Sequence, residues 1–191
     1  MILQALTEYY ENLAKQGKVS RKGWCRAKVS WAINLSKDGE IIGILPLKQE
    51  EERGKKKVQV PSLLIVPEMV TRSSGVSANF LCDNSKYLLG IDAEGTNKRV
   101  LDCFQAAKER HLQLLNGVEG ETARAVRLFF ESWDPKKADE CSEVRENWDN
   151  VTDGGNLIFC RNLNYAQDDP AIQEAWEWEK NGSEGGLEGI C

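Results

Sequence analysis

Cys-Arg-Ala-Lys-Val-Ser-Trp-Ala-Ile-Asn-Leu, residues 25–35, is the stretch that decides the fold. Its odd positions are all apolar, whereas its even positions are mostly polar and include Arg26 and Lys28. A period of two is typical of a β-strand with one buried and one wet side. Because Lys37-Asp38-Gly39 is a strong turn signal, residues 41–47 are predicted to return as the partner strand of a hairpin.

The segments on either side of this hairpin are predicted from their own periodicity. Residues 2–15 carry apolar side chains at helical spacing, so they are predicted to form an amphipathic helix that ends near Gly17. After the hairpin, the pattern predicts a charged hairpin tip or insertion at 49–57, a strand from Val58 that Pro61 places at an edge or ends, a short buried run at 63–66, a polar loop at 71–84 and a strand at 87–91.

The second half of the chain is predicted to be mostly helical. Helices are expected at 97–115 and around 123–133, and two more start at Asp-Pro pairs, at Asp134 and Asp169. A late strand is expected at 157–160. Strands followed by helices give an α+β fold, with a mostly antiparallel sheet from the N-terminal half and a helical C-terminal half.

One domain is expected to cover residues 1–180, strand-rich over 1–95 and helix-rich over 96–180. Residues 181–191 form a Gly/Glu/Ser-rich, linker-like tail with an abrupt end, which predicts a truncation of a longer protein. No apolar run approaches the roughly 20 residues of a membrane span, and no secretory signal is present, so we expect a cytoplasmic protein without a membrane partner. The six cysteines form no Cys-x-x-Cys pair and are predicted to be reduced and mostly buried.

The net charge of −5 hides an asymmetry between the two halves. Residues 1–110 hold 18 Lys and Arg against 13 Asp and Glu, a net +5, whereas residues 111–191 hold 7 against 17, a net −10. Such a division allows a basic face on the first half, with the acidic half turned away or facing another protein. Two halves that merely differ in surface charge remain the plainer reading.

The sequence predicts no catalytic residue, no metal site and no cofactor. No nucleotide-binding loop, hydrolase elbow or zinc-protease motif is present. The single histidine, His111, lies on an apolar helical stripe, where a partly buried structural role is expected. The nearest approach to an acidic nuclease cluster is irregularly spaced and fits solvated turns better: Asp83, Asp92, Glu94 and Asp102.

The polar loop is Thr-Arg-Ser-Ser-Gly-Val-Ser-Ala-Asn-Phe-Leu-Cys-Asp-Asn, residues 71–84. Its hydroxyl groups and the amides of Asn79 and Asn84 suit hydrogen bonding to base edges, and Arg72 suits guanine or phosphate. Phe80 is a candidate wedge or stacking ring, although it could equally anchor the loop in the core. An ordinary Ser/Gly surface turn is the alternative. The candidate DNA-contacting residues of the loop are Thr71, Arg72, Ser73, Ser74, Asn79 and Phe80.

Two basic groups outside the loop are candidates for phosphate contacts. Arg26 and Lys28 share the wet side of the first strand, where they could lie along a phosphate backbone or be merely solvated. Lys55, Lys56 and Lys57 form a cluster that could hold phosphate, although three preceding glutamates fit a plain soluble hairpin tip equally well. Of the six tryptophans, only Trp24 and Trp178 fall outside the apolar stripes expected in the core.

Four blocks of the sequence form one recognisable set: Met-Ile-Leu-Gln-Ala-Leu-Thr-Glu-Tyr-Tyr (1–10), Gly-Ile-Leu-Pro-Leu (43–47), Val-Pro-Glu-Met-Val-Thr-Arg-Ser-Ser-Gly-Val (66–76) and Asn-Phe-Leu-Cys-Asp-Asn-Ser-Lys-Tyr-Leu-Leu-Gly (79–90). In these blocks the chain resembles the large subunit of the type I-C (Dvulg subtype) CRISPR surveillance complex, Cascade, and the resemblance runs from Met1 to near residue 172. Members of that family are longer, so this chain would be the N-terminal part of one.

The resemblance implies a non-catalytic subunit at the 5′ handle of the CRISPR RNA, beside the subunit that processes that RNA. It implies recognition of the protospacer-adjacent motif (PAM) in target double-stranded DNA, help in opening the duplex, and support for recruiting the helicase–nuclease. Protein would then read the short motif, while base pairing reads the rest of the target. Two alternatives stay open: a scaffold that docks protein or the RNA handle without reading DNA, and a metal-dependent nuclease using the region of Asp83 and Asp92.

Overall fold

The structure is a computed structural model that describes residues 2–15 and 21–182. Within them, a mixed sheet of seven mostly antiparallel strands is covered by helices, which confirms the predicted α+β class. The expected helix stop at Gly17 and the tail beyond residue 182 lie outside the described residues. The strands are β1 (Trp24–Leu35), β2 (Ile41–Pro46), β3 (Lys48–Arg53), β4 (Lys56–Pro67), β5 (Cys82–Asp83), β6 (Asn156–Arg161) and β7 (Asn164–Tyr165).

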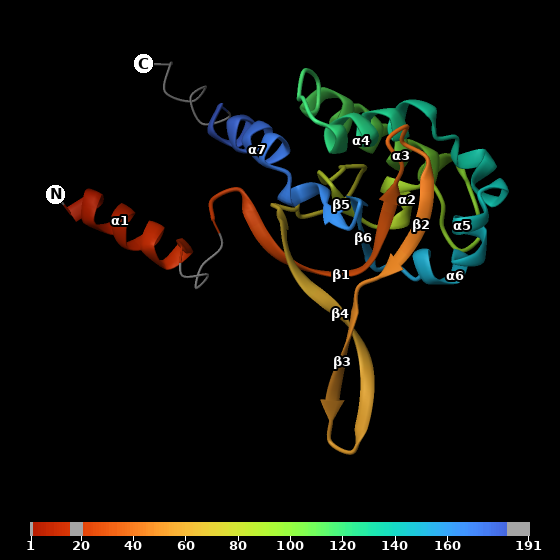
Figure 1. Cartoon of the computed structure of the whole chain (residues 1–191), viewed down its shortest axis with the longest axis horizontal. Helices are drawn as coiled ribbons and strands as arrows, with labels where there is room; N and C mark the ends of the chain where they lie inside the picture. The colour runs from red at the N-terminus through yellow and green to blue at the C-terminus, as the bar shows by residue number, and fades with distance from the viewer. Residues whose placement is uncertain (1, 16–20, 183–191) are drawn as a thin grey trace.

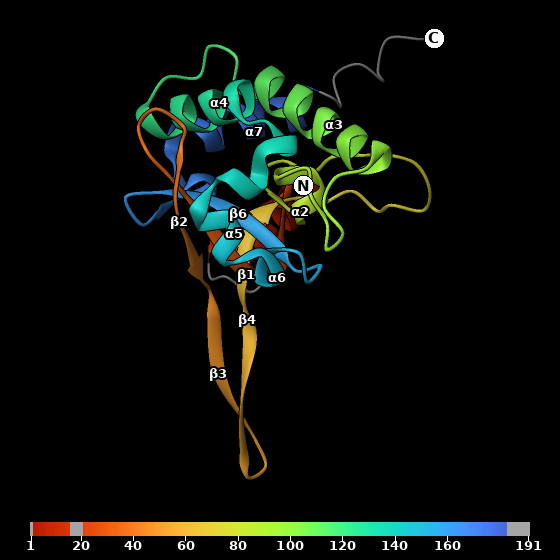
Figure 2. The same cartoon turned by 90° about the vertical axis from the view of Figure 1, so that its right-hand side faces the viewer.

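Helices α3, α4 and α7 gather on one side of the sheet, and the β3–β4 hairpin projects from the opposite end as a long arm (Figures 1 and 2). The helices are α1 (Ile2–Lys15), α2 (Ser85–Leu88), α3 (Lys98–Leu114), α4 (Glu121–Ser132), α5 (Ser142–Glu146), α6 (Trp148–Val151) and α7 (Pro170–Gly182), with short 3-10 turns η1 (Pro135–Glu140) and η2 (Ala166–Asp168). The predicted helix at 2–15 is therefore confirmed.

Strand β1 is the centre of the sheet because it pairs on both edges. It runs antiparallel to β2 and β4 and parallel to β6. The predicted hairpin with β2 is confirmed. The predicted single alternation is wrong, because the pairing with β6 shifts register between Val29 and Trp31. Such an irregularity changes which side of the strand the following residues face, so β1 contributes to the core on both sides from Ser30 onward.

The turn between β1 and β2 packs tightly under α4. Gly39 has a φ of +81°, and a Cβ placed there would lie 2.5 Å from the backbone nitrogen of Phe129. We therefore expect Gly39→Ala to lower the free energy of unfolding by roughly 2–4 kcal/mol in chemical denaturation, from left-handed strain plus the clash. Gly154→Ala is the matched control, since Gly154 has a φ of +92° with open space around it. Equal losses in the two variants would contradict the tight contact.

Three other predictions fail for local reasons. Residues 87–91 do not form a strand: Asn84 accepts a hydrogen bond from the Lys86 N–H and caps the short helix α2 instead. The helix expected from Asp134 breaks into η1, α5 and α6. In the run expected to be buried at 63–66, Leu63 and Ile65 are 57% and 54% exposed, because β4 turns one side to solvent. Of the two alternatives for Pro61, only the one that ends the strand is excluded, because β4 continues from Lys56 to Pro67.

Candidate nucleic-acid interface

The tip of the loop between β4 and β5 is an exposed row of small polar residues. Thr71, Ser73, Ser74, Gly75, Val76 and Ser77 are all exposed. Among the residues that the structure describes, no hydrogen bond engages the hydroxyl groups of Thr71, Ser73 or Ser74. Gly75 has a φ of +83° and open space around it, so the tip turns sharply without a side chain on its outer side. The tip therefore presents three free hydroxyl groups to solvent.

Arg72 belongs to this loop, but its guanidinium points away from solvent, toward Asp83 and Tyr87. Its Nη1 donates to Asp83 Oδ1 at 3.0 Å, and its Nη2 donates to Asp83 Oδ2. Its Nε donates to the carbonyl of Ser77 at 2.6 Å, and its guanidinium carbon lies 3.9 Å from the ring centre of Tyr87. Burial lowers the pKa of Arg72, but the hydrogen bond and charge of Asp83 outweigh it and raise the pKa above the usual value.

Asn79 closes the base of the loop. Its side-chain oxygen accepts the Val70 N–H at 2.8 Å, and only 3% of Asn79 is exposed. Its own N–H donates to Asp83 Oδ2 at 3.0 Å, and the Asn84 N–H donates to Oδ1 at 2.9 Å. The two amides that the sequence offered for base reading are thus engaged within the chain, Asn79 at the loop base and Asn84 as the cap of α2.

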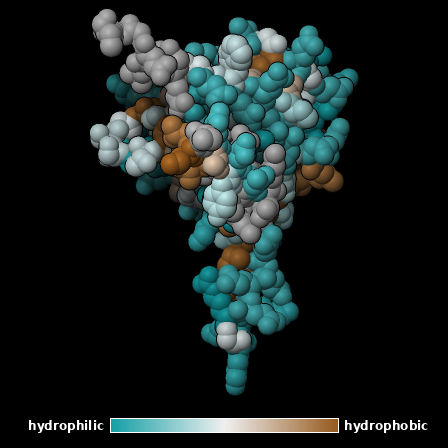
Figure 3. Space-filling model, turned by 90° about the vertical axis from the view of Figure 1, so that its left-hand side faces the viewer, coloured by the Kyte–Doolittle hydropathy of each residue, from teal (hydrophilic) through white to brown (hydrophobic). Residues whose placement is uncertain are grey.

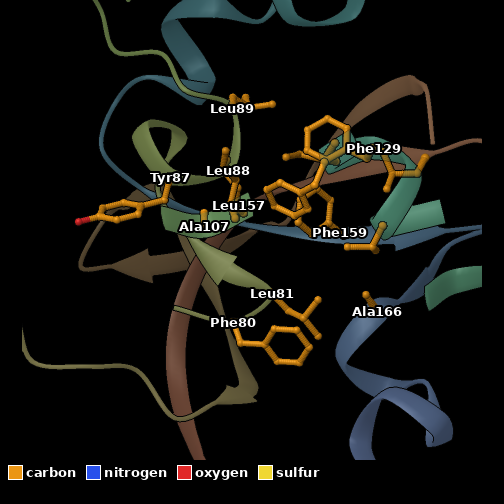
Figure 4. Close-up of a cluster of buried hydrophobic side chains, with 14 of the residues drawn as sticks. Phe80, Leu81, Tyr87, Leu88, Leu89, Ala107, Phe129, Leu157, Phe159 and Ala166 are labelled. Atoms are coloured by element: carbon orange, nitrogen blue, oxygen red, sulfur yellow. The ribbon is translucent and has the colours of Figure 1, made fainter. Parts of the chain in front are cut away.

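Phe80 and Leu81 anchor the loop in the core. Phe80 is 1% exposed, stacks on Trp176 with ring centres 5.4 Å apart, and lies beside other buried apolar side chains (Figure 4). Leu81 adopts a φ of +62° and donates its N–H to His111 Nε2 at 2.9 Å. The buried ring of Phe80 therefore anchors the loop in the core. It has no exposed edge with which to wedge into DNA or stack on a base.

His111 is fully buried beneath this anchor, as the apolar stripe of α3 predicts. Its Nδ1 lies 2.7 Å from the carbonyl of Ala107 and acts as donor there, because Nε2 accepts the Leu81 N–H. Burial, aided by the charge of Arg110, lowers the pKa of His111 to about 3, although the bond to Ala107 opposes this shift. The imidazole is therefore neutral near pH 7, and it holds the left-handed turn at Leu81.

The β3–β4 arm carries the three candidate lysines at and beside its tip. Lys57 pairs with Glu50 at 2.6 Å, and Arg53 pairs with Glu51 at 3.3 Å, so the shaft largely neutralises itself. Lys55 and Lys56 have no ion pair with a described residue. The paired charges along the arm fit a plain soluble hairpin. Lys55 and Lys56 at its tip, without an ion pair among the described residues, still fit a cluster that holds phosphate.

Arg26 and Lys28 lie exposed on β1, beside the apolar side chains of β4. Arg26 is opposite Ile65 in the antiparallel pair, and Lys28 is opposite Leu63. Paired residues point to the same side of a sheet, so two cations and two exposed apolar side chains share one open surface. This surface, the arm tip and the loop are separate places: β4, from Lys56 to Pro67, lies between arm tip and loop and is about 36 Å long measured along the strand.

Asp83 and Tyr87 hold the loop in place, a role that the sequence did not assign to either of them. Asp83 is fully buried and receives Arg72 and two backbone N–H groups. The Tyr87 hydroxyl accepts the Ser77 N–H at 3.3 Å. Nothing local marks Asp83 as a partner of Arg72, eleven residues earlier; the only signal was a carboxylate beside the buried run Phe80–Cys82.

The remaining candidate residues fall in ordinary structural places. Of the two tryptophans outside the apolar stripes, Trp24 is only 5% exposed and donates to Glu177 of α7, whereas Trp178 is exposed. The cysteines at 25, 82, 103, 141 and 160 are free thiols, and 82, 103 and 160 are buried. No described helix combines the length and apolar character that spanning a membrane needs. Across residues 2–15 and 21–182, no three His, Cys, Asp or Glu side chains gather as a group that could hold a metal ion.

Comparison with known proteins identifies the family. The model of the family described as CRISPR-associated protein (Cas_Csd1) matches residues 6–191. No curated protein matches the chain. The family match includes the arm, the loop and its anchor on His111, and it spans nearly the whole chain. The chain therefore belongs to the Cas_Csd1 family of CRISPR-associated proteins.

Proposed function

We propose that this chain is the N-terminal part of the non-catalytic large subunit of a type I-C Cascade complex, and that its loop reads the PAM of target double-stranded DNA. Membership of a CRISPR-associated family supports the general role. The blocks at 66–76 and 79–90, which resemble the large subunit, contain the loop and its anchor. The proposed setting is cytoplasmic, at the 5′ handle of the CRISPR RNA and beside the RNA-processing subunit.

The observation that carries the proposal is the loop tip. Three hydroxyl groups, at Thr71, Ser73 and Ser74, stand free on a loop that is held at its base and braced across its middle. Hydroxyl groups donate and accept, so they suit base edges and phosphate oxygens alike. A loop held in place before binding loses less conformational entropy on contact with DNA. Motif reading is thus assigned to the tip, and not to Asn79 or Phe80.

The basic groups supply affinity that does not depend on sequence. Lys55 and Lys56 at the arm tip are the strongest candidates, with Lys57, Arg26 and Lys28 as further phosphate contacts. The span of about 36 Å along β4 is close to one helical turn of DNA, roughly 34–36 Å. Loop and arm tip could therefore contact one duplex a turn apart, and such a grip would favour local opening. Recruitment of the helicase–nuclease is proposed for the assembled complex.

A scaffold role is the second candidate, and exposed apolar surface favours it. Ile2, Leu3, Leu6 and Tyr9 of α1 are exposed, and apolar surface gathers on that side of the molecule (Figure 3). An amphipathic helix with an uncovered apolar side is typical of a site for another protein. The nuclease alternative gains no such support, because both carboxylate oxygens of Asp83 are already engaged.

The test uses the complex assembled with CRISPR RNA, carrying Thr71→Ala, Ser73→Ala and Ser74→Ala together. Affinity is measured for targets with the natural motif and with an altered one. We expect the triple variant to assemble normally and to lose roughly 10- to 100-fold in affinity for the natural motif, with little change for the altered one. The double variant Lys55→Ala with Lys56→Ala should weaken binding to both targets equally and make the affinity depend less on salt concentration.

Thr96→Ala is the matched control, because it removes an exposed hydroxyl group outside the loop. If the triple variant discriminates between the two targets as well as the wild type, the loop does not read the motif. If assembly itself is lost, the scaffold role replaces DNA reading.

A further inference from the structure

The guanidinium of Arg72 has little capacity left for DNA. Its three nitrogens are engaged with Asp83 and with the Ser77 carbonyl, and one of its faces covers Tyr87. These contacts join the two ends of the tip, since Ser77 also donates its N–H to the Tyr87 hydroxyl. Arg72 thus ties residues 72 and 77 to the body of the protein on either side of Ser73–Val76.

The Asp83 end of this brace is fixed in the sheet. Asp83 is fully buried in β5 and pairs with Leu157 of β6. Its carboxylate also receives the N–H groups of Asn79 and Asn84. If Arg72 swung out to a phosphate, it would leave a buried carboxylate without its charged partner, which is strongly unfavourable. The geometry therefore disfavours an Arg72 that leaves Asp83 to contact DNA.

We infer that Arg72 and Asp83 are positioning residues: they fix the loop tip for contact with DNA and contact no nucleic acid themselves. The inference rests on the proposed function of the loop. An exposed arginine in a DNA-binding loop would contact phosphate or a base, whereas Arg72 fixes the loop instead. Because the pair carries no net charge and stays together, it adds no phosphate contact and no term to the salt dependence of binding.

A bracing role and a phosphate-binding role for Arg72 predict different effects of substitutions at Arg72 and Asp83. If Arg72 is a brace, Arg72→Lys, Arg72→Gln and Asp83→Asn all loosen the tip, because lysine keeps the charge but loses the two-pronged geometry. If Arg72 is a phosphate ligand, Arg72→Lys keeps most of the affinity, and Asp83→Asn strengthens binding by removing a competing anion. Arg72→Lys therefore separates the two roles, because it keeps the positive charge and loses the two-pronged geometry.

The experiment measures affinity for the natural and the altered motif over a range of salt concentrations, in complexes assembled to wild-type stoichiometry. We expect each of the three variants to lose about 10-fold in affinity for the natural motif, with an unchanged slope of log affinity against log salt. The double variant Arg72→Gln with Asp83→Asn should lose no more than either single variant, since one change already breaks the brace.

A slope lowered by about 0.9 in Arg72→Gln but kept in Arg72→Lys would overturn the inference, as would tighter binding by Asp83→Asn. Full discrimination between the two targets in all three variants would also overturn it, because the brace would then be merely structural. Failure of the proposed function looks different: the triple tip variant would discriminate normally whatever Arg72 does. If that triple variant loses discrimination while the Arg72 and Asp83 variants keep it, only the present inference fails.

Discussion

Replacing Asp83 with alanine is expected to lower the free energy of unfolding by roughly 3–5 kcal/mol. Three donors meet this buried carboxylate: the Arg72 guanidinium and the backbone N–H groups of Asn79 and Asn84. Removing the carboxylate leaves the partly buried Arg72 cation without its anion and the N–H groups of Asn79 and Asn84 without an acceptor, and each such loss adds its own penalty. Against a typical total stability of roughly 5–15 kcal/mol, this loss is large.

Denaturant titration of the isolated chain measures the effect, and Glu68→Ala is its control. Glu68 pairs with Lys180 at 3.1 Å, but its side chain is 56% exposed. Breaking a solvent-exposed ion pair costs only about 0–1 kcal/mol. A loss for Asp83→Ala no greater than that of Glu68→Ala would contradict the role of Asp83 as the buried centre of the loop.

Acid is expected to destabilise the protein through His111. The pKa of His111 is about 3 in the folded protein, against about 6.5 in an unfolded chain. Between these values the unfolded chain binds a proton that the folded protein does not, so stability falls as the pH falls, by up to about 1.4 kcal/mol per pH unit. From pH 7.5 to 5.0, this one group accounts for about 2 kcal/mol.

The measurement compares the wild type with His111→Gln at these two pH values. Glutamine offers an oxygen to the Leu81 N–H but does not titrate, while all other groups are common to both proteins. The wild type should therefore lose about 2 kcal/mol more than the variant on acidification. Parallel losses would mean that His111 titrates normally in the folded protein and does not hold the Leu81 turn as a neutral ring.

The sequence was sufficient to predict the fold class and most elements with clear periodicity. The helix at 2–15, the β1–β2 hairpin and the charged hairpin that became the arm all follow from local pattern and turn residues. The shift in register after Val29 was not predictable, because it depends on how β1 pairs with β6, more than 120 residues later. The strand expected at 87–91 failed because the Asn84 cap outweighs the apolar run.

The place of the loop was predictable, but the roles within it were not. Its exposed half, Thr71–Ser77, matches the expectation of a polar loop at the surface. From Ala78 onward the chain enters the core, and nothing in the composition marks that change. Arg72, Asn79 and Phe80 carry the chemistry of DNA contacts, yet partners within the folded chain engage all three: Asp83, the Val70 N–H and Trp176.

Cross-linking from the loop tip tests the central claim most directly. A photoreactive benzoylphenylalanine at Val76, which is exposed two residues after Ser74, would be irradiated in the assembled complex bound to target duplex DNA. Leu163, exposed on the β6–β7 turn, is the control position. If the loop reads the PAM, the Val76 position should cross-link to nucleotides of the motif, and the Leu163 position should not. Cross-links from Val76 only to protein or to the CRISPR RNA, in a complex that binds its target normally, would contradict the claim.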